Sequence, residues 1–120
     1  MHEIGIESSL VEAIRSGEKT IEGRLGTPKL LDIKEGDTLS VREDIWREGE
    51  IIGSHEEHVA LKVTQVLYFE NFTEMFQAVN YEAVIPAAKN AEEARAVYDT
   101  FYNDKDELEY GVVALFFELL

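Results

Sequence analysis

The chain has 120 residues, carries a formal net charge of −14 and contains no cysteine. This length fits one domain, residues 1–120, and is too short for two ordinary ones. The lack of cysteine excludes disulfides, thiolate catalysis and thiolate zinc sites. The excess of 25 acidic over 11 basic residues excludes nucleic-acid binding through a broad basic face, so any contact with RNA must use a local basic pocket.

The first residues and the apolar runs of the chain indicate its cellular location. The first residues have neither the basic region nor the apolar region of a signal peptide. No apolar run reaches the roughly 20 residues that a membrane-spanning helix needs. We therefore expect a cytoplasmic protein that does not contact a membrane.

The first elements predicted are a strand and a short helix. Residues 2–6 read as a strand, and residues 9–16 carry apolar side chains at helical spacing. Ser9 and Glu12 have the spacing of a capping box at the helix start. Gly17 provides the stop signal at the helix end.

The middle of the chain is predicted to be mostly strand. Residues 19–25 and 38–46 read as strands, and residues 47–57 read as a hairpin loop or irregular arm. Residues 59–68 alternate cleanly between apolar and polar at first, and the alternation then slips. The slip predicts a β-bulge near residues 64–65.

The last third of the chain predicts two helices and a buried strand. Asn71 with Glu74, and Asn90 with Glu93, have the spacing of helix N-caps. Residues 111–117 are short, apolar and rich in β-formers, which predicts a central strand buried on both faces. The helical stripes expected in the core are Phe72, Met75, Phe76 and Val79, followed by Ala94, Val97, Tyr98 and Phe101.

The sum of these elements predicts an α+β fold with five or six mostly antiparallel strands and about three short helices. The strands do not alternate regularly with helices, so a doubly wound parallel sheet is not expected. A small barrel or curled sheet with helices at its ends fits the order better.

The run from Gly17 to Arg24, Gly-Glu-Lys-Thr-Ile-Glu-Gly-Arg, is the main candidate for function. The residue types alone favour a surface ion pair between Glu22 and Arg24, worth under ~1 kcal/mol, with Lys19 in solvent. On a regular strand Lys19 would face away from the other two, so a shared cleft requires irregular backbone near Lys19. If Glu22 is ionised, Lys19 is expected to be a fixed cation. If a dry cleft protonates Glu22, Glu22 itself is expected to act as an acid.

This run resembles the signature of the ASCH domain family, in the form Gly-x-Lys-x-x-Glu-x-Arg. Other segments resemble the family in the same order along nearly the whole chain. They are Ile33-Lys34-Glu35-Gly36-Asp37, Tyr68-Phe69-Glu70-Asn71-Phe72, the pair Tyr98 and Tyr102, and Tyr110-Gly111-Val112-Val113-Ala114.

The resemblance implies a PUA-like β-barrel with a cleft beside the motif strand, and binding of RNA or of a modified nucleoside or nucleotide. Some small members are amidohydrolases that remove the acetyl group from N(4)-acetylcytidine. By this resemblance Lys19 and Glu22 are the catalytic candidates, and Glu82 is the candidate for a more distant carboxylate. The characterised enzymes carry threonine where this chain has Glu22, which leaves two alternatives: an amidohydrolase, or a non-catalytic module that binds RNA or a nucleotide.

The candidate ligand-binding residues are Arg24, Gly17, Tyr68 and Tyr110. Trp46 and Tyr68 each offer an aromatic face on which a base can stack, and Tyr102 and Tyr110 are candidates for closing the cleft. The tetrad His55-Glu56-Glu57-His58 lacks the helical spacing of a zinc motif and is expected to be a solvated loop. We expect no metal and no organic cofactor. The acidic charge by itself leaves a cationic protein partner as a third possibility.

Overall fold

The computed structural model describes residues 2–54 and 59–120. Within them, six strands form one sheet and six helices complete a mixed α+β domain. The strands are β1 (His2–Glu7), β2 (Ile21–Leu25), β3 (Thr38–Arg47), β4 (Glu50–Ser54), β5 (Val59–Phe69) and β6 (Val112–Leu119). The helices are α1 (Ser8–Ser16), α2 (Pro28–Leu31), α3 (Phe72–Ala78), α4 (Tyr81–Val84), α5 (Ala91–Asp99) and α6 (Asp104–Tyr110).

The sheet has the order β1-β3-β5-β6-β2, and β4 pairs with β3 beyond this path. Only the pairing of β1 with β3 is parallel among the described strands, so the expected antiparallel character is confirmed. No described backbone pairing joins β1 to β2, so the sheet is curled but open and a closed barrel is not confirmed. This open seam between β1 and β2 is the feature of the fold that positions the site.

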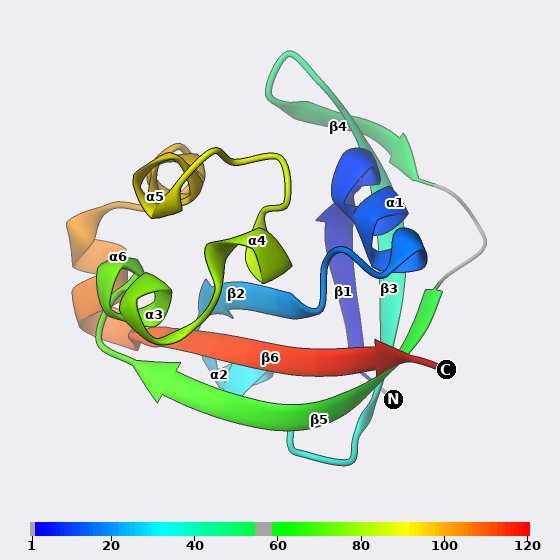
Figure 1. The fold of residues 1–120 in the computed structure, drawn as a ribbon, viewed down its shortest axis with the longest axis horizontal. Helices are drawn as coiled ribbons and strands as arrows, with labels where there is room; N and C mark the ends of the chain where they lie inside the picture. The colour runs from blue at the N-terminus through cyan, green and yellow to red at the C-terminus, as the bar shows by residue number, and fades with distance from the viewer. Residues whose placement is uncertain (1, 55–58) are drawn as a thin grey trace.

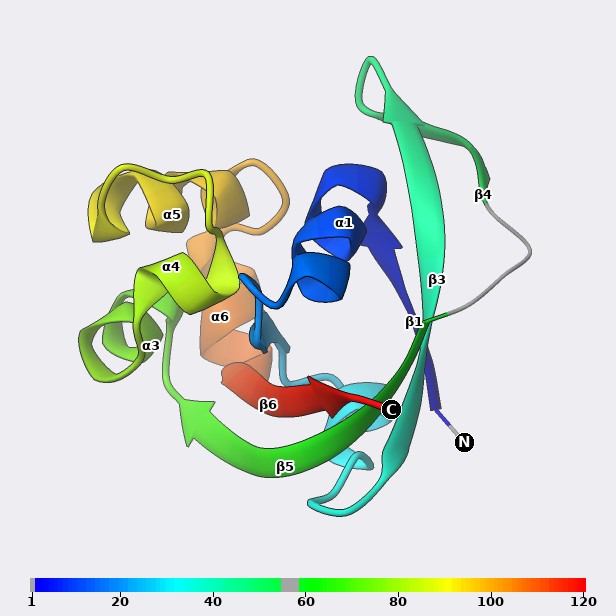
Figure 2. The same cartoon turned by 45° about the vertical axis from the view of Figure 1, so that its right-hand side comes forward.

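The helices divide between the two ends of the sheet (Figure 1). Helices α3 to α6 gather at one end, while α1 lies beside β1 and β3. The β3–β4 hairpin extends beyond the rest of the sheet (Figure 2). The expected number of about three helices is too low, because only α1, α3 and α5 were predicted from the sequence.

Local sequence signals explain several element boundaries. Asn71 accepts a hydrogen bond from the Glu74 amide at 2.8 Å, and Asn90 accepts one from the Glu93 amide at 2.8 Å, so both predicted caps are confirmed. The register of β5 against β6 shifts between Val63 and Gln65, which confirms the predicted bulge.

The predicted capping box at the start of α1 is wrong. The helix begins at Ser8, with Glu7 at the N-cap position and no side-chain cap bond. The Ser9 hydroxyl donates to the Glu7 carboxylate instead. Serine side chains compete in this way between backbone amides and any nearby acceptor, and a carboxylate is the stronger acceptor.

The core consists of two apolar clusters on opposite sides of the central strand β6. One joins α1 to β1, β3, β5 and β6, and the other joins β2 and β6 to α3, α4 and α5. Residues Val112 to Leu115 are fully buried, which confirms the prediction of a central strand buried on both faces. The predicted stripe on α3 is buried throughout, but Phe101 is 58% exposed and its assignment to the core is wrong.

Candidate functional site

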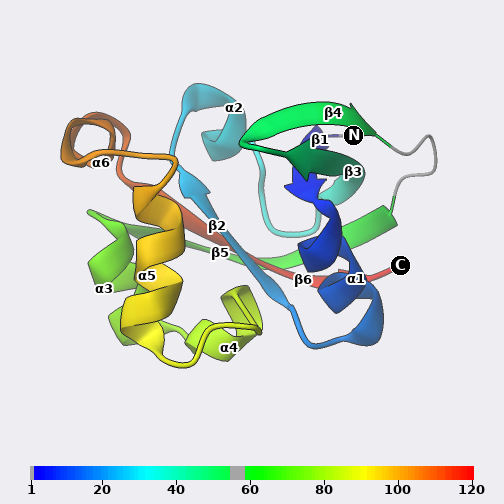
Figure 3. The same cartoon turned by 90° about the horizontal axis from the view of Figure 1, so that it is seen from above.

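A cavity of about 740 Å³ lies at the open seam between β1 and β2. This volume falls in the range of about 300–1,000 Å³ that is usual for small-molecule sites. Four parts of the chain line it: β1 with the start of α1, strand β2, the β3–β4 hairpin, and the region around the end of α5. Seen from above, β2 runs between α5 on one side and α1 on the other (Figure 3).

Side chains occupy the facing edges of β1 and β2 where strand pairing is missing. Arg24 in β2 donates through Nη2 to the carbonyl oxygen of Gly5 in β1. The Tyr98 hydroxyl lies close to Gly23 of β2. Backbone groups at a strand edge need partners when they are removed from water. Here the Arg24 side chain supplies such a partner to β1 and leaves a space between the strands.

Lys19 is fully buried just before β2 begins. Its Nζ donates to the carbonyl oxygens of Ile21 at 2.7 Å and Val84 at 2.6 Å, and it lies 3.1 Å from Oε1 of Glu22. These contacts use all the protons of an ammonium group. The chain is not yet in regular strand at Lys19, which meets the condition for Lys19 and Glu22 to lie on the same side.

Glu22 is the centre of a buried three-residue ion network. Its Oε1 contacts Lys19, and its Oε2 accepts from Nε of Arg24 at 3.0 Å. Burial alone would raise the pKa of Glu22, but the charges of Lys19 and Arg24 and their hydrogen bonds outweigh burial and lower it. Glu22 is therefore a carboxylate and not the proton donor that a dry cleft would have produced.

The two cations of the network differ in their access to the cavity. Burial lowers the pKa of Lys19, against the opposing attraction of Glu22, and Lys19 does not line the cavity. Arg24 and Glu22 do line it. Within the described part of the chain, no residue accepts a hydrogen bond from Nη1 of Arg24. The cavity thus presents a carboxylate acceptor beside a guanidinium donor.

Aromatic rings form another part of the cavity wall. Trp46 from the hairpin and Phe101 from beyond α5 meet edge to face, with ring centroids 5.9 Å apart. Tyr102 and Tyr98 continue this wall. Burial raises the pKa of Tyr98 well above 10, so its hydroxyl remains protonated. Trp46 and Tyr102, both named as aromatic candidates from the sequence, therefore lie at the cavity.

The remaining predicted site residues lie elsewhere. Gly17 ends α1 with a φ of 86° and does not line the cavity. Tyr68 and Tyr110 are 56% and 39% exposed on β5 and at the end of α6, and neither reaches the cavity. Glu82 is exposed in the first turn of α4, also outside the cavity lining.

No metal site is found among the residues that the structure describes, because no three metal-ligating side chains cluster there. The tetrad at positions 55–58 lies outside the described residues. Within residues 2–54 and 59–120, no helix is both long and apolar enough to span a membrane.

Glu7, Tyr98 and Phe101 line the cavity but were not predicted from the sequence as cavity residues. Tyr98 and Phe101 fit the spacing of a core stripe, and nothing in that spacing shows that the helix ends at Asp99. Glu7 carried no signal, since it was one of 25 acidic residues in the chain.

Comparisons with known proteins give a consistent result. Residues 4–120 match the ASCH domain. The crystal structure of hypothetical protein PH0355 is similar, with a TM-score of 0.81 and 33% identity over 98% of this chain and 97% of that chain. The solution NMR structure of protein PF0455 from Pyrococcus furiosus has a TM-score of 0.72 and 33% identity, over 99% of this chain and 96% of that chain. No curated protein matches.

Proposed function

The chain belongs to the ASCH domain family, and we propose that the cavity at its open seam binds the base of a nucleoside or of another RNA-derived ligand. Domains of this family are associated with RNA and nucleotide binding. The single observation that carries the proposal is that one cavity is lined both by a polar pair and by aromatic rings. Glu22 and Arg24 form a polar wall, and Trp46, Phe101 and Tyr102 form an aromatic wall.

The two walls match the two surfaces of a nucleobase. A base has an apolar face that stacks on aromatic side chains and a polar edge that exchanges hydrogen bonds. The carboxylate of Glu22 can accept from an exocyclic amino group, and Nη1 of Arg24 can donate to a ring nitrogen or carbonyl. The guanidinium is held in place by Gly5 and Glu22, so little side-chain entropy remains to be lost on binding.

A fluorescence titration tests this proposal directly, because Trp46 is the only tryptophan and lines the cavity. We expect saturable changes in Trp46 emission when nucleosides, including N(4)-acetylcytidine, are added. Arg24→Lys keeps the positive charge but loses the planar fork of donors, and it is expected to weaken binding about tenfold.

Arg47→Lys is the control for that variant, since Arg47 is exposed on the hairpin and does not line the cavity. It is expected to bind like the unmodified protein. The proposal fails if neither nucleosides nor short RNAs produce a saturable signal at low salt.

Hydrolysis of an acylated nucleoside is the second candidate, favoured by the contact of Lys19 with a cavity-lining carboxylate. In this reaction water adds to the amide carbonyl carbon, the bond from carbon to nitrogen breaks, and acetate and the free amine result. Arg24 would polarise the carbonyl oxygen and the Glu22 carboxylate would accept a proton from water. The buried, fully bonded state of Lys19 argues against a direct role for its nitrogen.

Chromatography of the same mixtures distinguishes hydrolysis from binding alone. If the second candidate holds, N(4)-acetylcytidine is converted to cytidine and acetate, and Arg24→Lys slows the conversion while the protein remains folded by circular dichroism. Cytidine formation no faster than with heat-denatured protein would eliminate hydrolysis and leave the binding function standing.

A further inference from the structure

The charged groups that line the cavity are Glu7, Glu22 and Arg24. Glu22 is the shared partner of Arg24, with Nη2 3.0 Å from Oε2, and of the buried Lys19. The two cations are balanced by the two carboxylates Glu22 and Glu7, so the charges at the cavity sum to zero. A phosphate monoester brings about 1.5 to 2 further negative charges at neutral pH, and the cavity offers no surplus positive charge to such a group.

At the polar wall, too few donors are available for a phosphate. The ammonium of Lys19 is charged, but its protons are used by Ile21, Val84 and Glu22. Of the Arg24 donors, only Nη1 has no acceptor among the described residues. A phosphate at Nη1 would lie close to the ionised Glu22 carboxylate, whereas phosphate sites rely on several converging donors.

The start of α1 is the second place where an anion would be expected, because a helix N-terminus attracts negative charge. Glu7 occupies the N-cap position and lines the cavity. The Ser9 hydroxyl donates to the Glu7 carboxylate, and the Ser8 hydroxyl donates to Glu43 at 2.7 Å. A carboxylate of the protein itself therefore already stands at this N-terminus.

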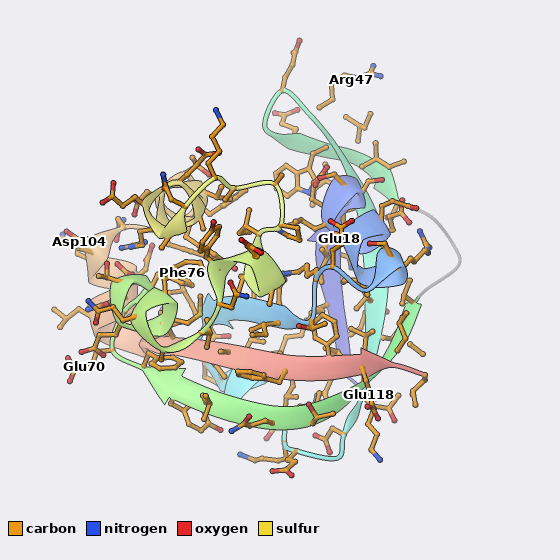
Figure 4. The ribbon with its side chains drawn as sticks, viewed as in Figure 1. Glu18, Arg47, Glu70, Phe76, Asp104 and Glu118 are labelled. Carbon is orange, nitrogen blue, oxygen red and sulfur yellow. The ribbon has the colours of Figure 1, made fainter. Side chains whose placement is uncertain are left out.

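The β3–β4 hairpin beside the cavity is no more favourable to a phosphate. Its tip next to Gly49 carries Arg47, which is followed by Glu48 and pairs across the hairpin with Glu50. Figure 4 shows Arg47 at the outer end of the hairpin, away from the body of the domain. The whole chain adds the field of a net charge of −14, which repels anions before they arrive.

From these three positions we infer that the cavity takes a ligand without a phosphate group, as a free nucleoside or nucleobase and not as a nucleotide or an RNA strand. This inference rests on the proposed function. It narrows the ligand class and makes Glu7 a specificity-determining residue, because its carboxylate lines the cavity at the start of α1 and repels a ligand phosphate there.

The test compares each ribonucleoside, and N(4)-acetylcytidine, with its 5′-monophosphate and with a short oligoribonucleotide, by the Trp46 titration at several salt concentrations. The monophosphate is expected to bind at least about tenfold more weakly than its nucleoside at low salt. Added salt screens this repulsion, so the monophosphate should gain affinity as salt rises while the nucleoside changes little. A site that grips phosphates shows the opposite slope.

Glu7→Gln removes the carboxylate at the start of α1 and is expected to reduce the preference for nucleoside over monophosphate about three- to tenfold. Glu12→Gln is the matched control, because it removes the same charge from the same helix at a side chain that is 78% exposed and outside the cavity lining. The control should leave the preference unchanged.

Three results would overturn the inference in whole or in part. A monophosphate or oligoribonucleotide that binds as tightly as the nucleoside, with affinity falling as salt rises, removes this inference and leaves the proposed function intact. An unchanged preference in Glu7→Gln removes the role of Glu7. Absence of binding by every probe removes the proposed function itself, and the inference with it.

Discussion

Glu22→Gln is expected to lower the free energy of unfolding by about 3–5 kcal/mol, the cost typical of breaking a buried ion pair from one side. The carboxylate is the shared counter-ion of Lys19 and Arg24. Glutamine keeps the size of the side chain but leaves the buried Lys19 ammonium beside a second cation without compensation. Urea denaturation followed by Trp46 fluorescence and circular dichroism at neutral pH measures the loss.

Two further variants test whether the loss of stability in Glu22→Gln comes from the buried ion network. Glu18→Gln changes an exposed residue in the same segment and should alter stability by no more than about 0.5 kcal/mol. Lys19→Met removes the buried cation while Arg24 still pairs with Glu22, so its cost should be smaller than that of Glu22→Gln. Equal stability of Glu22→Gln and Glu18→Gln would contradict the network as described.

The pH dependence of this difference follows from the lowered pKa of Glu22. In the unfolded chain Glu22 returns to its ordinary pKa of 4.5, so its stabilisation is fully present above that pH. It is lost as pH falls through the lower pKa of the folded state. The gap in unfolding free energy between unmodified protein and Glu22→Gln should therefore be constant at neutral pH and shrink on acidification below about 4.5. A gap that widens in acid would contradict the assignment.

The parts of the fold that the sequence predicted correctly are those with local causes. Asn71 and Asn90 cap helices because their side chains reach amides only three residues away. The bulge in β5 was visible because one extra residue reverses the alternation of faces. The family resemblance, which depends on ordered segments along the chain, is also confirmed.

The missed helices have two different causes. Helices α2 and α4 contain four residues each, too few to show a helical period. Helix α6 does carry a signal, since Asn103 and Asp106 form a capping box. Its acidic and mostly exposed residues lack an apolar stripe, so periodicity alone could not reveal it.

The proximity of the three charged motif residues was predictable from the sequence, but their burial and their bonding were not. The motif placed Lys19, Glu22 and Arg24 together, and the structure brings them into contact. The burial of Lys19 depends on the Val84 carbonyl, 65 positions along the chain, and no local pattern encodes that contact. The closing of the cavity by Phe101 depends in the same way on the hairpin that carries Trp46.

Phe72→Ala is expected to cost about 3–5 kcal/mol, the range for emptying a buried phenylalanine site. Phe72 is completely buried in α3 and stacks on Tyr98 and Tyr102, with ring centroids 4.2 Å and 5.7 Å away. The Arg95 guanidinium lies over the same ring at 5.5 Å. Truncation therefore removes packing from two of the rings that line the cavity, and binding should weaken along with stability.

Phe101→Ala makes the same chemical change at an exposed ring and separates binding from stability. Phe101 contacts Trp46 in the cavity lining and is largely exposed, so its removal should change the free energy of unfolding by about 0.5 kcal/mol or less. Loss of a stacking ring should weaken nucleoside binding by about 1–3 kcal/mol. Denaturation curves and Trp46 titrations of the two variants measure both quantities. A large loss of stability in Phe101→Ala, or unchanged nucleoside affinity, would show that the aromatic wall is structural and that the ligand lies elsewhere.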